Sequence, residues 1–260
     1  MTVNGHRAQA PTETTIRIAA AGDVHCRESH RGEVAAAFGA LEGSVDLLLL
    51  AGDLTTCGET AEAEVLAAAC EPLSMPVVAV LGNHDWHAGH ADEVNGILEG
   101  AGVEMLERGS TIHEIRGHEV GIAGAKGFVG GFGAAHLPDF GEPLLRRVYR
   151  ETSEDVEALG RGLREIANCP LRVVLLHYSP TETTLEGERQ DIWTFLGTDR
   201  LAAPILEHQP DLVLHGHAHA GRLEGRIGEV PVYNVSVPVI GRDFWILELS
   251  VPARAVTPIR

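Results

Sequence analysis

The sequence Val77-Val78-Ala79-Val80-Leu81-Gly82-Asn83-His84-Asp85 decides the fold that we expect for this chain. Its first five residues are apolar, and a continuous apolar run of this length is typical of a buried parallel strand. Gly82 lets the backbone turn sharply, so an amide, an imidazole and a carboxylate follow directly after the strand. In open α/β sheets the carboxyl ends of the strands carry the ligand site. The stretch therefore predicts an α/β fold with a polar site at Asn83, His84 and Asp85.

The same arrangement, an apolar run followed at once by polar side chains, recurs four times in the chain. The polar groups are Gly22-Asp23-Val24-His25, Gly52-Asp53, His177 and Gly216-His217-Ala218-His219. They follow the predicted strands Ile16 to Ala21, Leu47 to Leu50, Leu171 to Leu176 and Asp211 to Leu214. Because strand ends of this kind meet at one edge of an α/β sheet, we expect these side chains to converge.

The converging side chains offer oxygen and nitrogen donors and no thiolate: Asp23, His25, Asp53, Asn83, His177, His217 and His219. Carboxylate, amide and imidazole together suit manganese, iron, zinc or cobalt, and suit neither a cysteine-type structural zinc nor an all-oxygen calcium site. These donors are too many for one tetrahedral ion but suffice for two ions if one carboxylate bridges them. A two-metal centre is a recurrent device for hydrolysing phosphate esters.

Strands and helices alternate over the first hundred residues. We predict helices across Glu33 to Leu41, Glu59 to Cys70 and Ala91 to Ala101, after the first, second and third strands. A hairpin of Ser110 to Ile115 and Glu119 to Ala123 then begins a second, partly antiparallel sheet. The simplest architecture is two mixed β-sheets packed together with helices outside.

The segment around residues 124–168 is predicted to be a glycine-rich and helical insertion. Gly124 to Pro143 is irregular, and two helices follow, Pro143 to Arg150 and Ser153 to Ile166, the second with Ser153 as its N-cap. Beyond this segment we predict a helix across Leu201 to His208 and the C-terminal strands Leu223 to Ile227, Val230 to Val235 and Trp245 to Leu249.

Length and composition indicate a single domain over residues 15–260, after a flexible N-terminal tail at residues 1–14. The chain has 260 residues, of which 44% are hydrophobic, enough for a substantial core. The tail lacks the apolar segment of a signal peptide, and no later stretch is long enough to span a membrane. Without an export signal, we expect Cys26, Cys57, Cys70 and Cys169 to be free thiols in the reducing cytoplasm.

The net charge restricts the partners that the protein can bind. A formal charge of -17 repels polyphosphate backbones and argues against tight binding to long nucleic acid. A small phosphorylated substrate is compatible with this charge. The oligomeric state is left open, with a homodimer among the alternatives.

Taken together and in this order, the motifs DVH, GD, GNHD, H and GHAH between Asp23 and His219 resemble those of the calcineurin-like metallophosphoesterase superfamily. The resemblance implies a four-layer αββα sandwich with two metal ions. One ion would be held by Asp23, His25, Asp53 and His219, and the other by Asp53, Asn83, His177 and His217, with Asp53 as the bridge. It also implies that a metal-bridging hydroxide attacks phosphorus in line, while His84 stabilises or protonates the leaving oxygen and Asp85 orients His84.

Departures from branches of that superfamily narrow the expectation. The Ser/Thr protein phosphatases carry GDYVDRG and GNHE, whereas this chain has Gly52-Asp53-Leu54-Thr55-Thr56-Cys57-Gly58 and ends the later motif in Asp85. Purple acid phosphatases place a tyrosine where Thr56 stands, and the lipid A pathway hydrolases have an arginine at the position of His84. The pattern is closest to the broad bacterial group of small phosphodiesterases and phosphatases.

Three further residues are candidates for substrate contact. Lys126 begins a glycine-rich loop and could approach a substrate phosphate, although a flexible connector explains the loop equally well. Tyr178 and Trp193 lie beside and after His177 and could stack on a base or an aromatic ester, although ordinary packing also explains aromatic residues.

We therefore expect a binuclear metal-dependent phosphoesterase that cleaves small phosphodiesters. Hydrolysis of phosphomonoesters is the enzymatic alternative. A non-catalytic protein-interaction scaffold on the same fold is the alternative of another class, but a scaffold would have lost metal ligands, and this chain keeps the whole set.

Overall fold

Strands that are buried on both faces form the centre of the molecule. In the computed structural model, which describes residues 13–251, every residue of β2 (Leu47–Ala51) and of β3 (Val77–Val80) is buried. Successive side chains of a strand point to opposite faces, so Leu47 and Leu49 face the second sheet while Leu48 and Leu50 face the helices. This double burial explains the continuous apolar runs in the sequence.

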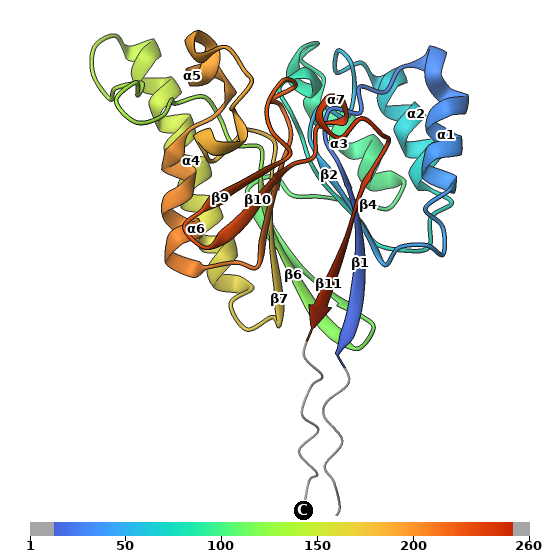
Figure 1. Ribbon diagram of the computed structural model, residues 1–260. Helices are drawn as coiled ribbons and strands as arrows, with labels where there is room; N and C mark the ends of the chain where they lie inside the picture. Colours follow the sequence, from blue (N-terminus) through green and yellow to red (C-terminus); the bar gives the residue numbers. More distant parts are fainter. Residues whose placement is uncertain (1–12, 252–260) are drawn as a thin grey trace, which may run out of the picture.

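The first sheet has five strands in the order β11-β1-β2-β3-β4. The strands β1 (Thr14–Ala21), β2, β3 and β4 (Val103–Met105) run parallel, and β11 (Trp245–Val251) pairs antiparallel with β1. Three helices cover its outer face: α1 (Arg31–Gly39), α2 (Thr60–Cys70) and α3 (Ala91–Gly100) (Figure 1).

The second sheet has six strands in the order β5-β6-β7-β8-β10-β9. The strands β6 (His118–Ala125), β7 (Leu171–Leu176), β8 (Leu212–His215) and β10 (Val230–Asn234) are parallel, and β5 (Gly109–Ile115) and β9 (Glu224–Ile227) pair antiparallel at the two edges. The helices α4 (Pro143–Glu165) and α6 (Ala202–His208) pack on its outer face.

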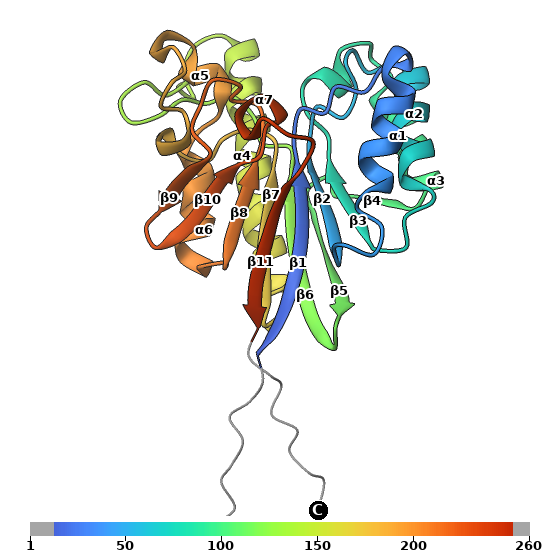
Figure 2. The same ribbon diagram turned by 45° about the vertical axis from the view of Figure 1, so that its right-hand side comes forward.

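The inner faces of the two sheets pack against each other. Their shared core contains Ile16 and Ile18 of β1, Ile122 of β6 and Val173 and Leu175 of β7, all fully buried. The layers are therefore helix, sheet, sheet and helix, and Figure 2 shows the two helical layers on either side of the paired sheets. This confirms the four-layer αββα sandwich.

Short helical elements lie in the loops at the carboxyl ends of the strands. Two are single turns of α-helix, α5 (Trp193–Leu196) and α7 (Val237–Ile240). The others are 3-10 turns at Glu28–His30, His84–Trp86, Glu182–Thr184, Gln190–Ile192 and Asp199–Leu201.

Two expectations about local structure are wrong, and one short strand was missed. The helices predicted on either side of Ser153 are one helix, α4, and Ser153 does not cap it, because its hydroxyl donates to the carbonyl of Tyr149 at 2.9 Å inside the helix. The short strand β4 was not predicted. The N-terminal tail does not extend to residue 14, since Thr14 begins β1, and residues 1–12 lie outside the described part of the chain.

Candidate metal centre

The seven predicted donors meet above the carboxyl ends of β1, β2, β3, β7 and β8. Within the described residues, three groups of carboxylate and imidazole side chains could each hold a metal ion, with ligand atoms within 4.8 Å of one another. The groups are Asp23, His25 and His219; His25, Asp53 and His84; and Asp53, His177 and His217. Strand ends of both sheets contribute, so the centre joins the two halves of the sandwich.

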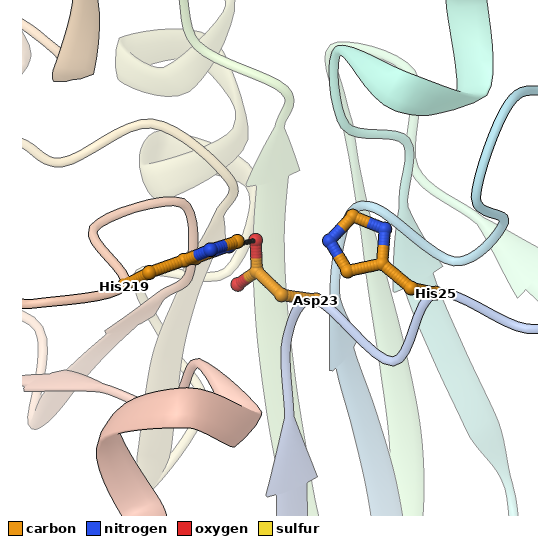
Figure 3. A group of neighbouring side chains, drawn as sticks. All are labelled: Asp23, His25 and His219. Carbon is orange, nitrogen blue, oxygen red and sulfur yellow. Dashed lines mark hydrogen bonds and ion pairs between the residues drawn. The ribbon is translucent and has the colours of Figure 1, made fainter.

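Asp23 stands between donors from the two sheets. Its Oδ1 lies 2.9 Å from Nε2 of His219, and its Oδ2 accepts a hydrogen bond of 2.8 Å from the backbone N–H of His217. Figure 3 shows the carboxylate at the end of β1 between the rings of His25 and His219. The chain therefore presents one carboxylate and two imidazoles to a common point.

Asp53 occupies the middle of the centre and is 1% exposed. Its Oδ1 lies 3.3 Å from Nε2 of His177 and accepts a 2.8 Å hydrogen bond from the backbone N–H of His84. Its Oδ2 lies 3.9 Å from Nε2 of His25 and 3.9 Å from Nε2 of His84. One carboxylate thus faces two sets of imidazoles, which is the arrangement a bridging ligand needs.

Asn83 completes the second set through its amide. Its Oδ1 lies 2.9 Å from Nε2 of His177, beside the group formed by Asp53, His177 and His217. Each donor of the set expected from the sequence is therefore at the centre.

Backbone carbonyl groups fix the orientation of three histidine rings. Nδ1 of His177 lies 2.9 Å from the oxygen of Ala51, Nδ1 of His25 lies 3.2 Å from that of Thr55, and Nδ1 of His84 lies 2.7 Å from that of Thr56. A carbonyl oxygen can only accept, so each Nδ1 carries the proton and each Nε2 is turned toward Asp53. This is the outer-shell support that metal-binding histidines commonly have.

The backbone at the centre adopts conformations that ordinary residues rarely take. Positive φ angles occur at Asp23 (58°), His25 (48°), Asp53 (50°) and His217 (69°). Such conformations cost energy for residues with a side chain and cluster at functional sites. At four of the seven donors, the backbone therefore adopts a strained conformation that directs the side chain toward the centre.

Gly82 is required by space rather than by a left-handed turn. A Cβ atom at this position would lie 2.1 Å from Oδ1 of Asp53 and 2.2 Å from its backbone nitrogen. Any side chain at this position would displace the carboxylate of Asp53. The GNHD motif therefore requires a glycine at residue 82 for steric reasons.

The two central carboxylates differ in pKa. Burial alone would raise the pKa of Asp23, but the hydrogen bond with His219 and the charges of His177 and His219 hold it well below its usual range. Burial and the nearby charge of Asp23 raise the pKa of Asp53. In the absence of cations the two acids therefore repel each other, and a bound cation would relieve that repulsion.

Two of the imidazoles, those of His177 and His217, are kept in the neutral form that binds metals. Burial lowers the pKa of His177 and lowers the pKa of His217 to about 4, so both rings are neutral near pH 7. The hydrogen bond with Asp23 raises the pKa of His219. Neutral imidazole and ionised carboxylate are the states in which these groups coordinate metal ions.

Asp85 supports the loops around the centre. Its buried carboxylate accepts hydrogen bonds from the N–H groups of Leu54 (3.1 Å), Thr55 (2.8 Å) and Gly82 (2.7 Å) and from the hydroxyl of Thr55 (2.6 Å). The Nδ1 of His84 meets the carbonyl of Thr56 instead. Asp85 thus holds the loops that carry Asp53 and His84, and its role in orienting His84 stays a prediction.

These donors fit a metal centre of the expected kind. They are carboxylate, amide and imidazole groups that converge from five strand ends, and hydrogen bonds within the protein fix their orientation. Within the described residues, none of the groups that could hold a metal ion contains a cysteine. Such a donor set suits manganese, iron, zinc or cobalt.

A cavity of about 360 Å³ opens beside the centre and is lined by Asn83, Trp86, Lys126, Phe128, Glu151 and Tyr178. Lys126 and Tyr178 were expected to contact substrate, and the structure brings both to this cavity. Trp193 lies elsewhere, packed against the small cluster of Phe132, Leu185, Leu196 and Ala218, with its indole N–H donating to the carbonyl of Glu188. Packing, the alternative weighed for Trp193, accounts for its position.

Three cavity residues, Trp86, Phe128 and Glu151, escaped the sequence reasoning, and Phe128 lies in the glycine-rich loop that begins at Lys126. Trp86 stands immediately after the GNHD motif, and this position could have drawn attention to it. Glu151 lies on α4, far along the chain from any motif, and no sequence signal marks it.

Comparison with solved structures shows the same fold in distant relatives. The chain is similar to phosphopantetheinyl hydrolase from Mycobacterium tuberculosis, with a TM-score of 0.63 and 16% identity over 86% of this chain and 90% of that one. It is also similar to a putative 5′-nucleotidase from Staphylococcus aureus, with a TM-score of 0.56 and 14% identity over 95% of this chain and 56% of that one. GAP50, the anchor in the inner membrane complex of Plasmodium, has a TM-score of 0.51 and 11% identity over 86% of this chain and 72% of that one.

Within the described residues, no helix is both long and apolar enough to cross a membrane.

No curated protein matches the sequence. The family model for calcineurin-like phosphoesterases matches residues 16–221, a range that contains every donor of the centre. The chain therefore belongs to the calcineurin-like phosphoesterase family.

Proposed function

We propose that this protein hydrolyses small phosphodiesters at a centre of two divalent or mixed-valence transition-metal ions. The observation that carries the proposal is the position of Asp53, whose carboxylate belongs to one group with His177 and His217 and to another with His25 and His84. One carboxylate shared by two sets of donors supports two ions rather than one.

We assign the ligands as the family resemblance implies. Asp23, His25, Asp53 and His219 would hold the first ion, and Asp53, Asn83, His177 and His217 the second. The ions would be manganese, iron, zinc or cobalt. Two bound cations supply charge that neutralises the phosphate and activates water for attack on phosphorus.

We infer that His84 moves a proton during the reaction. Its side chain is 41% exposed, its Nδ1 is fixed on the carbonyl of Thr56, and its Nε2 is turned toward the centre. A doubly protonated His84 can donate from Nε2 to the leaving oxygen of the ester. We therefore assign His84 the role of general acid, with Asp85 holding the loop that carries it.

The charge of the protein favours a diester over a monoester. A phosphodiester carries one negative charge near neutral pH, whereas a phosphomonoester carries nearly two, and the chain has a net charge of -17. Phosphomonoester hydrolysis is the alternative, and the intact donor set argues against a purely structural scaffold.

The cysteines support a location in the cytoplasm. All four, Cys26, Cys57, Cys70 and Cys169, lie in the described part of the chain and are free. Free thiols are the usual state in a reducing compartment.

Metal analysis combined with turnover of two esters tests the proposal. The protein is stripped with a chelator, reloaded separately with manganese, iron, zinc or cobalt, and assayed with bis-p-nitrophenyl phosphate and p-nitrophenyl phosphate in the presence of a thiol reductant. We expect two ions per chain, no turnover after stripping, recovery on reloading, and a higher kcat/KM for the diester.

Other outcomes would change the assignment. One ion per chain at full activity would contradict the binuclear centre. A higher kcat/KM for the monoester would make the protein a phosphatase. Absence of turnover with every metal would contradict the enzymatic proposal.

A further inference from the structure

The cavity beside the centre connects both halves of the sandwich. Trp86 comes from the turn after β3, Lys126 and Phe128 from the loop after β6, Tyr178 from the end of β7 and Glu151 from α4. Asn83 lines the cavity and also lies 2.9 Å from the ring of His177 through its Oδ1. A phosphoester with its phosphorus at the centre would therefore place an organic group in this cavity.

Three of the six residues that line the cavity are aromatic. Trp86 is 48% exposed at the cavity, although an indole usually finds burial. The rings of Phe128 and Tyr178 pack edge to face, with centroids 5.9 Å apart, and the Tyr178 ring lies 4.4 Å from that of His217. Exposed faces of aromatic side chains beside a phosphate site favour stacking with a flat ring.

Acidic side chains outnumber the cationic side chains near the cavity. The guanidinium of Arg108 pairs with Glu151, with Glu154 at 2.8 Å and with Asp155 at 2.6 Å. The ammonium of Lys126 donates to the carbonyl of Gly127 at 3.0 Å and lies 4.4 Å from the centroid of Phe128. Burial lowers the pKa of Lys126, whereas the charges of Asp155, Glu107 and Glu151 oppose that shift. Carboxyl groups outnumber the two cations here, which disfavours an additional anionic group.

We propose that this cavity binds the organic group of the phosphoester and selects a planar, uncharged aromatic ring of the size of a phenyl group or a nucleobase. Trp86 and Phe128 supply the stacking faces, and Glu151 with its acidic neighbours disfavours groups that carry a second anion. The cavity volume of about 360 Å³ lies in the range of small-molecule sites. The inference rests on the proposed phosphoesterase function.

Phosphonates test this selectivity without turnover. Benzylphosphonate and cyclohexylmethylphosphonate share the anionic head and nearly the same size, but only the first has a flat aromatic ring. We expect calorimetry on the metal-loaded protein to give a Kd about 10-fold lower for benzylphosphonate, since base stacking on an aromatic side chain is worth about 5- to 150-fold in affinity. The phosphonate analogue of thymidine monophosphate, binding more tightly than cyclohexylmethylphosphonate, would extend the support to nucleobases.

Substitutions of the cavity residues test which side chains cause the preference for the aromatic phosphonate. Trp86→Ala and Phe128→Ala should each bring the ratio of the two Kd values toward one, whereas Trp86→Phe should keep most of the preference. Phe140→Ala is the matched control, because Phe140 is an aromatic residue that is 79% exposed and does not line the cavity. Thermal unfolding and metal content of each variant show that the fold and the centre persist.

A second comparison tests the charge. We expect 4-carboxybenzylphosphonate to bind about 10-fold more weakly than benzylphosphonate, and Glu151→Gln to narrow this difference. Equal Kd values for benzylphosphonate and cyclohexylmethylphosphonate would overturn the aromatic selectivity, and tighter binding of the carboxylated analogue would overturn the charge selectivity. Turnover of bis-p-nitrophenyl phosphate is measured on the same samples. Turnover without the expected differences in Kd would contradict the selectivity of the cavity alone, whereas absence of turnover would contradict the proposed phosphoesterase function.

Discussion

Oδ1 of Asp23 lies 2.9 Å from Nε2 of His219, although 196 positions separate the two residues in the sequence. Asp23 follows β1 of the first sheet, and His219 follows β8 of the second. The candidate centre therefore ties together two sheets whose inner faces pack through apolar side chains, which links metal binding to the stability of the whole domain.

Removal of metal should lower the stability of the protein. Asp23 and Asp53 are buried acids that repel each other, and ions that bind the folded state add about 2.7 kcal/mol of stability at a concentration 100-fold above their Kd. We expect chelation to lower the melting temperature and reloading to restore it, measured by calorimetry. A melting temperature independent of metal would contradict binding at this centre.

Asp53→Ala should lose both ions, whereas Asn83→Ala should mainly weaken the second. The reason is that Asp53 faces both sets of imidazoles, while Asn83 contacts His177 of one set. Elemental analysis of the purified variants measures this. Asp191→Ala removes an acid that is 60% exposed and serves as the control. An Asp53→Ala protein that retained two tightly bound ions would rule out the bridging role.

The His84→Ala substitution should slow the hydrolysis of esters with poor leaving groups far more than the hydrolysis of esters with good leaving groups. General acid catalysis contributes about 10²- to 10⁴-fold, and nitrophenolate needs little of it, whereas an alkoxide needs much. We expect kcat of the variant to depend more steeply on leaving-group pKa than that of the wild type, with metal content unchanged. Parallel dependences would show that His84 only positions phosphate, and loss of metal would place it among the ligands, as its proximity to His25 and Asp53 allows.

Asp85→Ala should destabilise the fold. The carboxylate satisfies three backbone N–H groups and one hydroxyl, and each buried donor left unpaired costs about 1–3 kcal/mol. We expect urea denaturation to show a loss of about 3 kcal/mol or more, and a smaller loss for Asp85→Asn, which keeps a carbonyl acceptor. Asp211→Ala is the control, since Asp211 accepts from the N–H of Arg172 at an exposed site. Equal losses in Asp85→Ala and Asp211→Ala would contradict the structural role.

Stability should fall in alkaline solution, and Cys70 should account for part of the fall. Burial raises the pKa of Cys70 to about 12, whereas a thiol in the unfolded chain ionises near pH 8.5, about its ordinary value. Between these two pH values the folded state binds more protons than the unfolded state. The free energy of unfolding therefore decreases as pH rises, by up to about 1.4 kcal/mol per pH unit. Urea denaturation at pH 8 and pH 10 should therefore show a shallower pH dependence in Cys70→Ala than in the wild type.

The interpretation of that experiment rests on the slope with pH rather than on absolute stability, because Cys70→Ala also leaves a small cavity. Cys57→Ala, which removes an exposed thiol, is the matched control for loss of a cysteine. An unchanged slope in Cys70→Ala would mean that its thiol does not contribute to the alkaline effect.

The sequence by itself predicted most of the strands and the candidate donors. A strand buried on both faces requires an unbroken apolar run, and a site at its carboxyl end requires polar residues directly after that run. Both signals are local, so they can be recognised at Leu47 to Asp53 and at Val77 to Asp85 without the fold. For the same reason the sequence alone predicts the seven candidate donors.

Only the tertiary structure decided how these residues are supported and what lies beside them. The carbonyl groups of Ala51, Thr55 and Thr56 select the ring nitrogen that each histidine presents, and the required space around Asp53 explains Gly82. The continuity of α4 depends on its packing against the second sheet rather than on the capping preference of Ser153. The cavity needs Trp86 and Glu151 from opposite halves of the sandwich, and contacts between segments so distant in sequence arise only when the two sheets pack.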